Sequence, residues 1–397
     1  MKRCSILFVL VAATASLGCK RATPTNGDAG TSRASEATRE QVLRGIGECT
    51  ASEVASFATK AATFGQKANA AATVPSDATR KEAQDAWVAA IDQWERLEVM
   101  QFGPAATKAH PGGQDLRGSI YAWPLTSRCL IEQQIVSKAY EGATFSTALS
   151  SSRGLGAAEY LLFYAAPDNA CSAGATINAD GMWNALGATE IAARRLAYAG
   201  AVATDIAAVG TKLNTAWDPA QGNFVNELVK SVRGGSIYKT DQTAFNSVSD
   251  ALFYVEADVK DTKVAHPLGI LNCTTPTCPE GVESPYAKRS LTHIVNNLAG
   301  FRKLFFGCND GNGQAFDDLL DAIGASSINT SVKVALEQAE AALASITSPD
   351  LETAIAQQND KVRAVHTALK KLADVLKTEF VTVLDLELPQ RVEGDND

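Results

Sequence analysis

The stretch Arg153-Gly154-Leu155-Gly156-Ala157-Ala158-Glu159-Tyr160-Leu161-Leu162-Phe163 is almost free of polar side chains and carries one carboxylate in its middle. At helical spacing Glu159 shares a face with Leu155 and Leu162, and the neighbouring aromatic residues make the flanks of that face apolar too. The predicted helix therefore has no obvious side for water, as is typical inside a bundle. An unpaired buried carboxylate costs roughly several kcal/mol, so we expect Glu159 to have a partner, a raised pKa or a ligand.

Helical spacing of apolar residues continues through most of the chain, and no segment shows the alternation of a β-strand. Breaks fall at turns such as Phe102-Gly103-Pro104, and Ser284 with Pro285 predicts a helix start. The sequence therefore predicts an all-α fold with helices long enough for bundles. The predicted helices span residues 36–72, 77–101, 127–140, 153–163, 180–217, 224–232, 240–264, 286–306, 315–323, 331–346 and 349–388.

The composition is that of a globular protein with ample apolar material for one large core or two smaller ones. The chain has 397 residues, of which 46% are hydrophobic and 20% charged, and its formal net charge is -8. This excludes a disordered or fibrous chain. An acidic chain repels phosphates, so nucleic acid is not an expected partner.

The first 18 residues read as an export signal of the lipoprotein type. Lys2 and Arg3 precede a short apolar core over residues 6–13, which is too short to span a bilayer as a helix. Leu17-Gly18-Cys19 then resembles the bacterial lipobox, in which the Cys becomes the acylated first residue. The alternative is ordinary signal cleavage near Ala15. We expect a membrane anchor at Cys19 and a flexible tether over residues 19–38.

Cysteine counting also favours an exported protein. Removing Cys4 of the signal and Cys19 of the lipobox leaves an even number of thiols, which in an oxidising compartment predicts disulfides. Only Cys273 and Cys278 are close enough in sequence to suggest a pairing, and a zinc site is the rival interpretation. The remaining thiols are Cys49, Cys129, Cys171, Cys273, Cys278 and Cys308.

A second carboxylate points inward in the predicted helix over 77–101. Glu98 follows Trp87, Ile91 and Trp94 on one helical face, at positions i+11, i+7 and i+4. We therefore expect Glu98 on the aromatic side of this helix. The alternative is that the helix end turns toward solvent and leaves Glu98 at the rim.

Three other side chains are candidates to complete a site with these carboxylates. Arg153 immediately precedes the opening stretch, and Arg117 stands in the loop before Trp123. An Arg is a chemically sensible partner for a buried Glu, since its guanidinium matches a carboxylate. The sequence gives no distances between them.

The four His residues give no support to a zinc-peptidase site, because none lies in an HExxH pattern or pairs with another at i, i+4. His293 lies beside the apolar face of the predicted helix over 286–306. We interpret it as a half-buried His with its hydrogen bonds satisfied, ahead of a ligand-binding role.

Three segments together resemble the imelysin family of bacterial envelope proteins. They are Trp94-Glu95-Arg96-Leu97-Glu98-Val99-Met100-Gln101-Phe102-Gly103-Pro104, Tyr121-Ala122-Trp123-Pro124-Leu125 and the opening stretch, in this order. The resemblance covers about residues 36–388. It implies two packed helical bundles with a site between them, an exported location often by lipid anchor, and an association with iron acquisition. We accordingly place an N-terminal bundle at 39–178, a C-terminal bundle at 179–388 and an acidic tail at 389–397.

The resemblance includes the family signature Gly-x-His-x-x-Glu, with one departure. The signature Gly falls on Gly154 and its Glu on Glu159, but the His falls on Gly156, which has no side chain to ligate a metal. A hydrolytic metal needs about three protein ligands, so we lean against the peptidase activity once attributed to the family. Gly156 and Glu159 are one helical turn apart, which leaves a gap that another side chain, water or ligand can fill.

The leading hypothesis is an outer-membrane lipoprotein that faces the periplasm or the cell surface. It holds iron, another divalent metal or a small ligand between its bundles, with Glu159 and Glu98 as metal ligands. Arg153, Trp123 and Arg117 shape the pocket. The alternatives are a helical scaffold that interacts with an envelope protein without using the site, and a diverged metallopeptidase.

Overall fold

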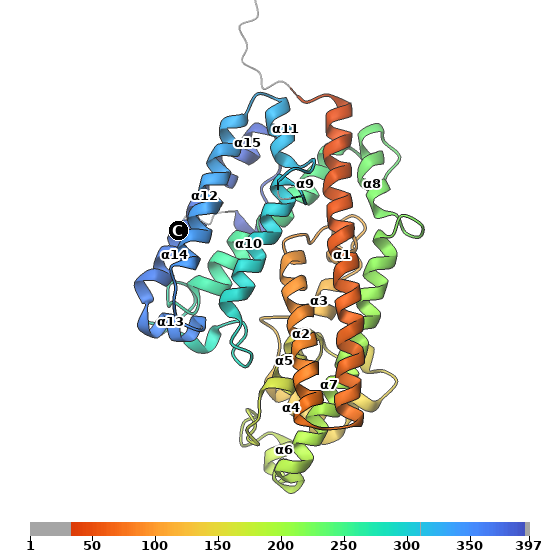
Figure 1. The fold of residues 1–397 in the computed structure, drawn as a ribbon, viewed down its shortest axis with the longest axis vertical. Helices are drawn as coiled ribbons and strands as arrows, with labels where there is room; N and C mark the ends of the chain where they lie inside the picture. The colour runs from red at the N-terminus through yellow and green to blue at the C-terminus, as the bar shows by residue number, and fades with distance from the viewer. Residues whose placement is uncertain (1–32, 310, 394–397) are drawn as a thin grey trace, which may run out of the picture. The chain divides into compact units, whose positions relative to one another are not determined.

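A computed structural model describes residues 33–309 and 311–393 (Figure 1). The signal, Cys19 and most of the tether lie outside these residues. In the described part of the chain all regular structure is helical, as predicted, and no strand occurs. The α-helices are α1 Glu36–Thr73, α2 Asp77–Leu97, α3 Leu116–Ile120, α4 Arg128–Ser137, α5 Gly154–Phe163, α6 Thr176–Ala179, α7 Met182–Trp217, α8 Phe224–Lys230, α9 Asp241–Leu252, α10 Ser290–Phe306, α11 Phe316–Ala322, α12 Ser326–Ala344, α13 Leu351–Gln357, α14 Asn359–Val375 and α15 Val381–Val383.

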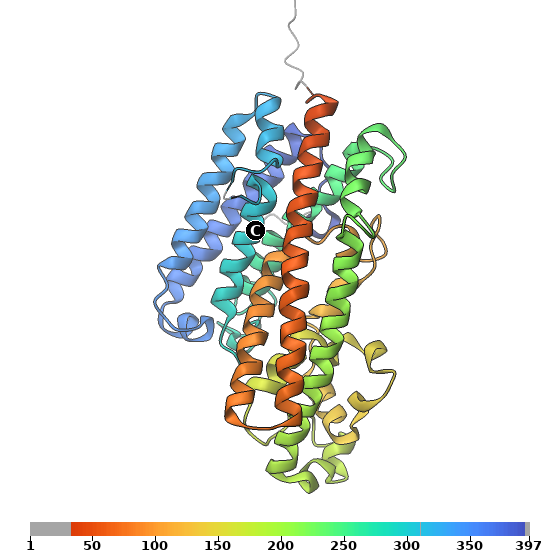
Figure 2. The same cartoon turned by 45° about the vertical axis from the view of Figure 1, so that its right-hand side comes forward.

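The long helices α1, α2 and α7 lie side by side in both ribbon views (Figures 1 and 2). Ser35 caps α1 through Thr38, and Ser76 and Thr79 form a reciprocal capping box at the start of α2. These caps satisfy backbone N–H groups that would otherwise lack partners. The short helix α5, which carries Glu159, packs against both α2 and α7.

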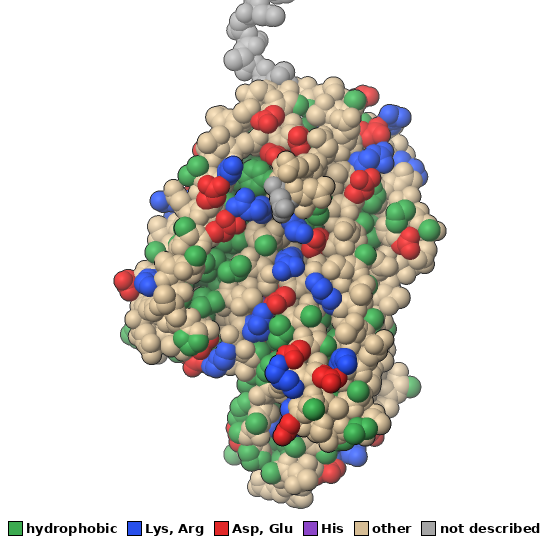
Figure 3. Space-filling view, in the orientation of Figure 1, with side chains coloured by type: hydrophobic (Ala, Val, Ile, Leu, Met, Phe, Trp, Pro, Cys, Tyr) green, Lys and Arg blue, Asp and Glu red, His purple; other side chains and the backbone are tan. Residues whose placement is uncertain are grey.

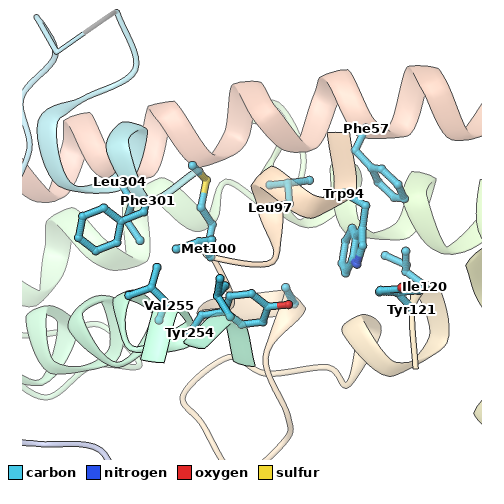
Figure 4. Close-up of a cluster of buried hydrophobic side chains, with 14 of the residues drawn as sticks. Phe57, Trp94, Leu97, Met100, Ile120, Tyr121, Tyr254, Val255, Phe301 and Leu304 are labelled. Atoms are coloured by element: carbon cyan, nitrogen blue, oxygen red, sulfur yellow. The ribbon is translucent and has the colours of Figure 1, made fainter. Parts of the chain in front are cut away.

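A second set of helices packs onto α2 through α10. Helix α12 lies against α14, and α14 contacts the π-helix Val255–Ala265. Figure 4 shows apolar side chains that run from one set to the other. Phe57 of α1 and Trp94 of α2 lie at one end, and Phe301 and Leu304 of α10 lie at the other, with Leu97 and Met100 between them. The core is therefore continuous between the two sets.

Residues from Arg33 onward cluster as one compact unit. Helix α7, which follows the predicted bundle boundary at 178/179, packs against α1 and α5 of the preceding segment. The division into bundles at 39–178 and 179–388 stays a prediction.

Several predicted helix limits are wrong, among them the start of α12, which is Ser326 and not residue 331. Helix α10 begins at Ser290 and not at Tyr286, since the preceding segment bonds to Glu159 as described below. The segment predicted as one helix over 240–264 is α9 followed by the π-helix Val255–Ala265. The predicted helix over 349–388 is interrupted at Gln358, where φ is -137° and ψ is 40°. That backbone geometry cannot continue an α-helix.

All six cysteines of the described residues form disulfides, as their even number predicts. The bridges are Cys49–Cys308, Cys129–Cys171 and Cys273–Cys278, the last being the pairing that the sequence suggested. Their sequence separations are 259, 42 and 5 residues. The zinc interpretation of these thiols is therefore wrong.

The surface in Figure 3 carries acidic and basic side chains intermixed, without a large area of one sign on that face. Among the described residues, no helix combines the length and the apolar character needed to cross a bilayer.

Candidate functional site

Helix α5 holds Glu159 in a fixed position within the core. The helix starts at Gly154, whose φ is +76°, and a Cβ there would lie 2.7 Å from the Ile120 carbonyl oxygen. Only glycine fits this positive φ and close approach. Glu159, which follows after more than one helical turn, is 2% exposed. The prediction of a buried carboxylate is confirmed.

Glu159 finds its partner in a loop distant in the sequence and not in an arginine. Its Oε1 accepts hydrogen bonds from the Ser284 hydroxyl at 2.9 Å and from the backbone N–H groups of Tyr286 at 2.9 Å and Ala287 at 2.8 Å. Burial raises the pKa of Glu159, and the Ala287 N–H offsets part of that rise. Its Oε2 accepts no hydrogen bond from the described residues.

A cavity of about 350 Å³ opens beside Glu159. Trp123 and Gly156 also line it, so three residues singled out from the sequence meet there. A Cβ at Gly156 would lie 2.6 Å from Thr126 Oγ1, which shows that Thr126 occupies the space of a side chain at position 156. Thr126 Oγ1 is itself buried without a hydrogen-bond partner among the described residues.

Arg153 does not reach Glu159. Its guanidinium bonds to Asp205 Oδ2 at 2.7 Å, to Ser119 Oγ at 3.1 Å and to the Ala148 carbonyl at 3.0 Å. These bonds join the start of α5 to α7 and α3. Arg153 therefore serves the packing around the cavity and is not part of its lining.

Glu98 is fully buried, so it does not lie at a solvent-exposed rim. Trp94 Nε1 donates to its Oε1 at 3.1 Å, and the Tyr254 hydroxyl donates to its Oε2. Arg117 Nε lies 3.5 Å from Oε1. Glu98 and Arg117 together line a second cavity, of about 790 Å³, rather than the one beside Glu159. With both oxygens engaged, Glu98 is a poor candidate for a metal ligand.

Between the two cavities lies a buried charge cluster that we call the acidic centre, made of Glu95, Glu283, His293 and Lys263. All four side chains are at most 1% exposed. Lys263 Nζ lies 2.7 Å from Glu95 Oε2 and 2.9 Å from Glu283 Oε1. Tyr121 donates to Glu283 Oε1 at 3.1 Å, and Figure 4 shows Tyr121 among buried hydrophobic side chains.

Three members of the acidic centre present donor atoms to one another. His293 Nδ1 lies 3.3 Å from Glu95 Oε1 and 3.2 Å from Glu283 Oε2. Neither these two oxygens nor the ring nitrogens of His293 make a hydrogen bond of good geometry within the described residues. A donor atom from each residue lies within 4.8 Å of the other two. Buried polar atoms without hydrogen bonds are rare, and imidazole with carboxylates is a donor set that suits iron and other divalent metals.

The acidic centre shifts the pKa of each of its members. Burial, together with the charge of Glu283, raises the pKa of Glu95. Burial alone would raise the pKa of Glu283, but Lys263 and His293 outweigh it and lower that pKa. Burial would lower the pKa of His293, yet the carboxylates of Glu95 and Glu283 raise it. Each shift therefore depends on charges held at contact distance.

The sequence pattern missed most of the acidic centre. The interpretation of His293 as half-buried and satisfied is wrong, since its side chain is fully buried and its ring nitrogens lack good hydrogen bonds. Glu95 precedes Glu98 by one helical turn beside Trp94, which is the one signal that pointed to it. Glu283 stands in a predicted loop and Lys263 near the end of the predicted helix over 240–264, and no motif marked either as a site residue.

Comparisons with known proteins agree with this architecture. A structure from Parabacteroides distasonis, named as that of an iron-regulated protein A precursor, matches with a TM-score of 0.67 at 16% identity, covering 88% of this chain and 95% of that chain. An imelysin-like protein from Psychrobacter arcticum also gives 0.67, at 15% identity over 90% and 99% of the two chains. No curated protein matches the sequence. The imelysin family model matches residues 51–378, and the chain therefore belongs to the imelysin family.

Proposed function

We propose that this protein is a lipid-anchored envelope protein that binds one divalent metal ion, iron in the first place, through Glu95, Glu283 and His293. The observation that carries the proposal is the convergence of donor atoms from these three residues, all within 4.8 Å of one another, in a fully buried position. The name of the similar protein from Parabacteroides distasonis, which refers to iron regulation, supports the choice of iron. The positive charge of a bound ion would neutralise two carboxylates that are buried away from water.

The metal ligands in this proposal differ from the pair expected from the sequence. Glu98 has both oxygens bonded to Trp94 and Tyr254, whereas Glu95 and Glu283 each keep one oxygen free of good hydrogen bonds. Glu283 also lines the cavity beside Glu159. An ion held by the acidic centre would thus have one ligand that borders a space open to small molecules.

The scaffold alternative has one observation in its favour. Lys263 already places a positive charge between Glu95 and Glu283. A buried cation of this kind neutralises carboxylates without a metal. On this alternative the acidic centre joins α2, α10 and the π-helix Val255–Ala265 and binds nothing.

Calorimetric titration distinguishes the two functions. The purified full chain is stripped with EDTA, dialysed and titrated with Fe(II) under anaerobic conditions, and with Mn(II) and Zn(II). We expect one ion per chain. His293→Asn and Glu95→Gln should each weaken binding at least about tenfold, since each removes a ligand. Glu53→Gln is the control, because Glu53 is a buried carboxylate on α1 outside the acidic centre.

A spectroscopic readout complements the titration. Co(II) in a site with imidazole and carboxylate ligands gives visible absorption bands that depend on the ligand set. We expect these bands to appear with the unmodified chain and to change in His293→Asn. Absence of binding by every ion tested, or binding that His293→Asn and Glu95→Gln leave unchanged, contradicts the metal proposal and favours the scaffold.

The anchor at Cys19 is the second part of the proposal. It is supported by the sequence Leu17-Gly18-Cys19 and by membership in a family of envelope proteins. Lys20 after the Cys favours the outer membrane over the inner membrane. The test is labelling with a radioactive fatty acid and fractionation: Cys19→Ala should lose the label and leave the membrane fraction. An unlabelled protein with an unchanged location contradicts the anchor.

A further inference from the structure

We propose that the cavity beside Glu159 binds a small organic cation that carries a primary ammonium group. This cavity shares Glu283 with the acidic centre, but neither Glu95 nor His293 lines it. The volume of about 350 Å³ falls at the lower end of the range of small-molecule sites, which is roughly 300–1,000 Å³. It exceeds many times the roughly 30 Å³ that one water molecule occupies.

Glu159 supplies the fixed negative charge. Its Oε1 is held by Ser284, Tyr286 and Ala287, so the carboxylate cannot turn away. Its Oε2 has no hydrogen bond from the described residues, although the side chain is 98% buried and borders the cavity. Burial therefore removes solvation from this carboxylate without a full set of hydrogen bonds in return. A cation that donates an N–H to Oε2 would compensate that desolvation cost.

Thr126 supplies a second acceptor next to Glu159. Its hydroxyl stands over Gly156, one helical turn before Glu159, and is buried without a partner in the described chain. A hydroxyl oxygen accepts a hydrogen bond from an ammonium group as readily as from water. Glu159 Oε2, which can only accept when ionised, and the Thr126 hydroxyl, which can accept or donate, therefore border the same cavity.

The remaining charges at the cavity favour a cation over an anion. Arg128 is already bonded to Glu132 at 2.7 Å and to Asp168 at 2.9 Å. Glu280 at the mouth is exposed and has no hydrogen bond or ion pair within the described residues. Glu283 also lines the cavity and is paired with Lys263. His266 lines it too, with Nδ1 near the Leu271 carbonyl. Among the described residues, the lining carboxylates without an ion pair are Glu159 and Glu280, and they would repel an anionic ligand.

Aromatic rings complete the wall. Trp123 and Tyr286 line the cavity, and Lys263 Nζ lies 5.9 Å from the centroid of the Trp123 ring. That distance is within the range of a cation–π contact, so Lys263 already uses the Trp123 ring, and the preference for a cation rests on Glu159 and not on this ring. A bare metal ion fits the cavity less well, because Glu159 and Thr126 offer fewer than the three ligands that it needs.

Calorimetric titration with putrescine tests the proposal on the purified full chain, with EDTA present so that metal binding plays no part. We expect one putrescine per chain and no binding of succinate, its anionic counterpart. Glu159→Gln and Thr126→Val should each weaken putrescine binding at least about fivefold, and Glu53→Gln should leave it unchanged. Tetramethylammonium, which has no N–H, should bind more weakly than putrescine.

Three results would overturn the proposal: no binding of putrescine, equal binding in Glu159→Gln and Thr126→Val, or binding of tetramethylammonium or succinate that equals that of putrescine. Gln at 159 still accepts from the three donors that hold Oε1, and Val at 126 keeps the volume of Thr, so both variants should fold. A cooperative melting curve checks this for each. Because EDTA is present throughout, failure here leaves the metal proposal untouched.

Discussion

At the scale of single residues, Lys263 is the cation that makes the acidic centre compatible with burial. Its side chain is 1% exposed, and contacts with Glu283 and Glu95 raise its pKa against the opposing effect of burial. Lys263 is therefore charged at neutral pH despite its burial. Its two closest carboxylate partners are contributed by α2 and by the loop before α10, so it also joins distant parts of the chain.

Replacing Lys263 should be strongly destabilising. Lys263→Met leaves two buried carboxylates without their cation, and we expect the free energy of unfolding to fall by about 3–5 kcal/mol. Urea denaturation at neutral pH measures this. Lys67→Met is the control, because Lys67 pairs with Glu82 at an exposed position and should contribute under about 1 kcal/mol. A loss for Lys263→Met no larger than that of the control contradicts the argument.

Asp317, in the first turn of α11, gives a pH dependence of known sign. Burial, with the charge of Asp318 beside it, raises the pKa of Asp317 from 3.8 to about 7. Between these values the unfolded chain releases the proton while the folded chain keeps it, so this group costs stability as pH rises and the cost is complete above pH 7. Asp317→Asn should thus raise the free energy of unfolding by about 1 kcal/mol at alkaline pH and leave it unchanged below pH 3.8. The effect is limited because the group is partly solvated. Urea denaturation across pH measures the difference; a gain that does not change with pH contradicts it.

The chemistry of the candidate site could be predicted only in part, because its partners come from distant segments. The anomaly of Glu159 was visible in the sequence, yet its donors are backbone N–H groups more than a hundred residues away, which no side-chain pattern reveals. Arg117 did approach Glu98, whereas Arg153 paired with Asp205. The sequence thus identified buried charged residues that require a partner, but only the structure identified those partners.

At the scale of elements, the contact between α2 and α10 depends on a glycine. A Cβ on Gly300 would lie 2.2 Å from the Arg96 carbonyl oxygen, so the two helix backbones approach more closely than any side chain allows. Glu95 on α2 and His293 on α10 are brought together by the same packing. The geometry of the acidic centre therefore rests on this close approach.

Gly300→Ala should force the two helices apart. We expect a loss of about 2–3 kcal/mol in the free energy of unfolding, as for other overpacked cores, together with weaker binding of any ion that the unmodified chain binds. The control is Gly118→Ala in α3, where nothing lies within 4 Å of the added carbon and the change should be neutral or slightly favourable. Thermal and urea unfolding measure both. Equal stability of the two variants contradicts the packing argument.

The apolar periodicity predicted where helices occur, but it did not predict where they begin and end. The face of α2 with Trp87, Ile91 and Trp94 is buried as its spacing predicts. The start of α10 was misplaced because Ser284 and Pro285 have the form of a helix start, yet the Ser284 hydroxyl bonds to Glu159 and not to its own helix. A tertiary contact of this kind overrides a local capping preference.

At the scale of the whole molecule, the Cys49–Cys308 bridge ties α1 to the segment after α10. A bridge over 259 residues restricts the unfolded chain far more than one over 5 residues. Cys49→Ala with Cys308→Ala should therefore lower the free energy of unfolding by about 3–5 kcal/mol. Cys273→Ala with Cys278→Ala, the control, should cost about 1–2 kcal/mol. Guanidinium denaturation without reductant measures both; an equal or reversed order contradicts the argument.

The Cys129–Cys171 and Cys273–Cys278 bridges both lie within the loop that Cys49–Cys308 closes, which affects how the disulfides form during synthesis. Synthesis proceeds from the N-terminus, so Cys49 emerges first, and Cys129 and Cys171 both follow before its partner Cys308 exists. Each is a chemically competent but wrong partner in the meantime. Correct maturation thus requires either that the Cys49 thiol remain reduced until almost the whole chain has appeared, or that an early wrong bridge be reshuffled by thiol exchange. Among the cysteines of the described residues, Cys49 is synthesised first and its partner Cys308 last.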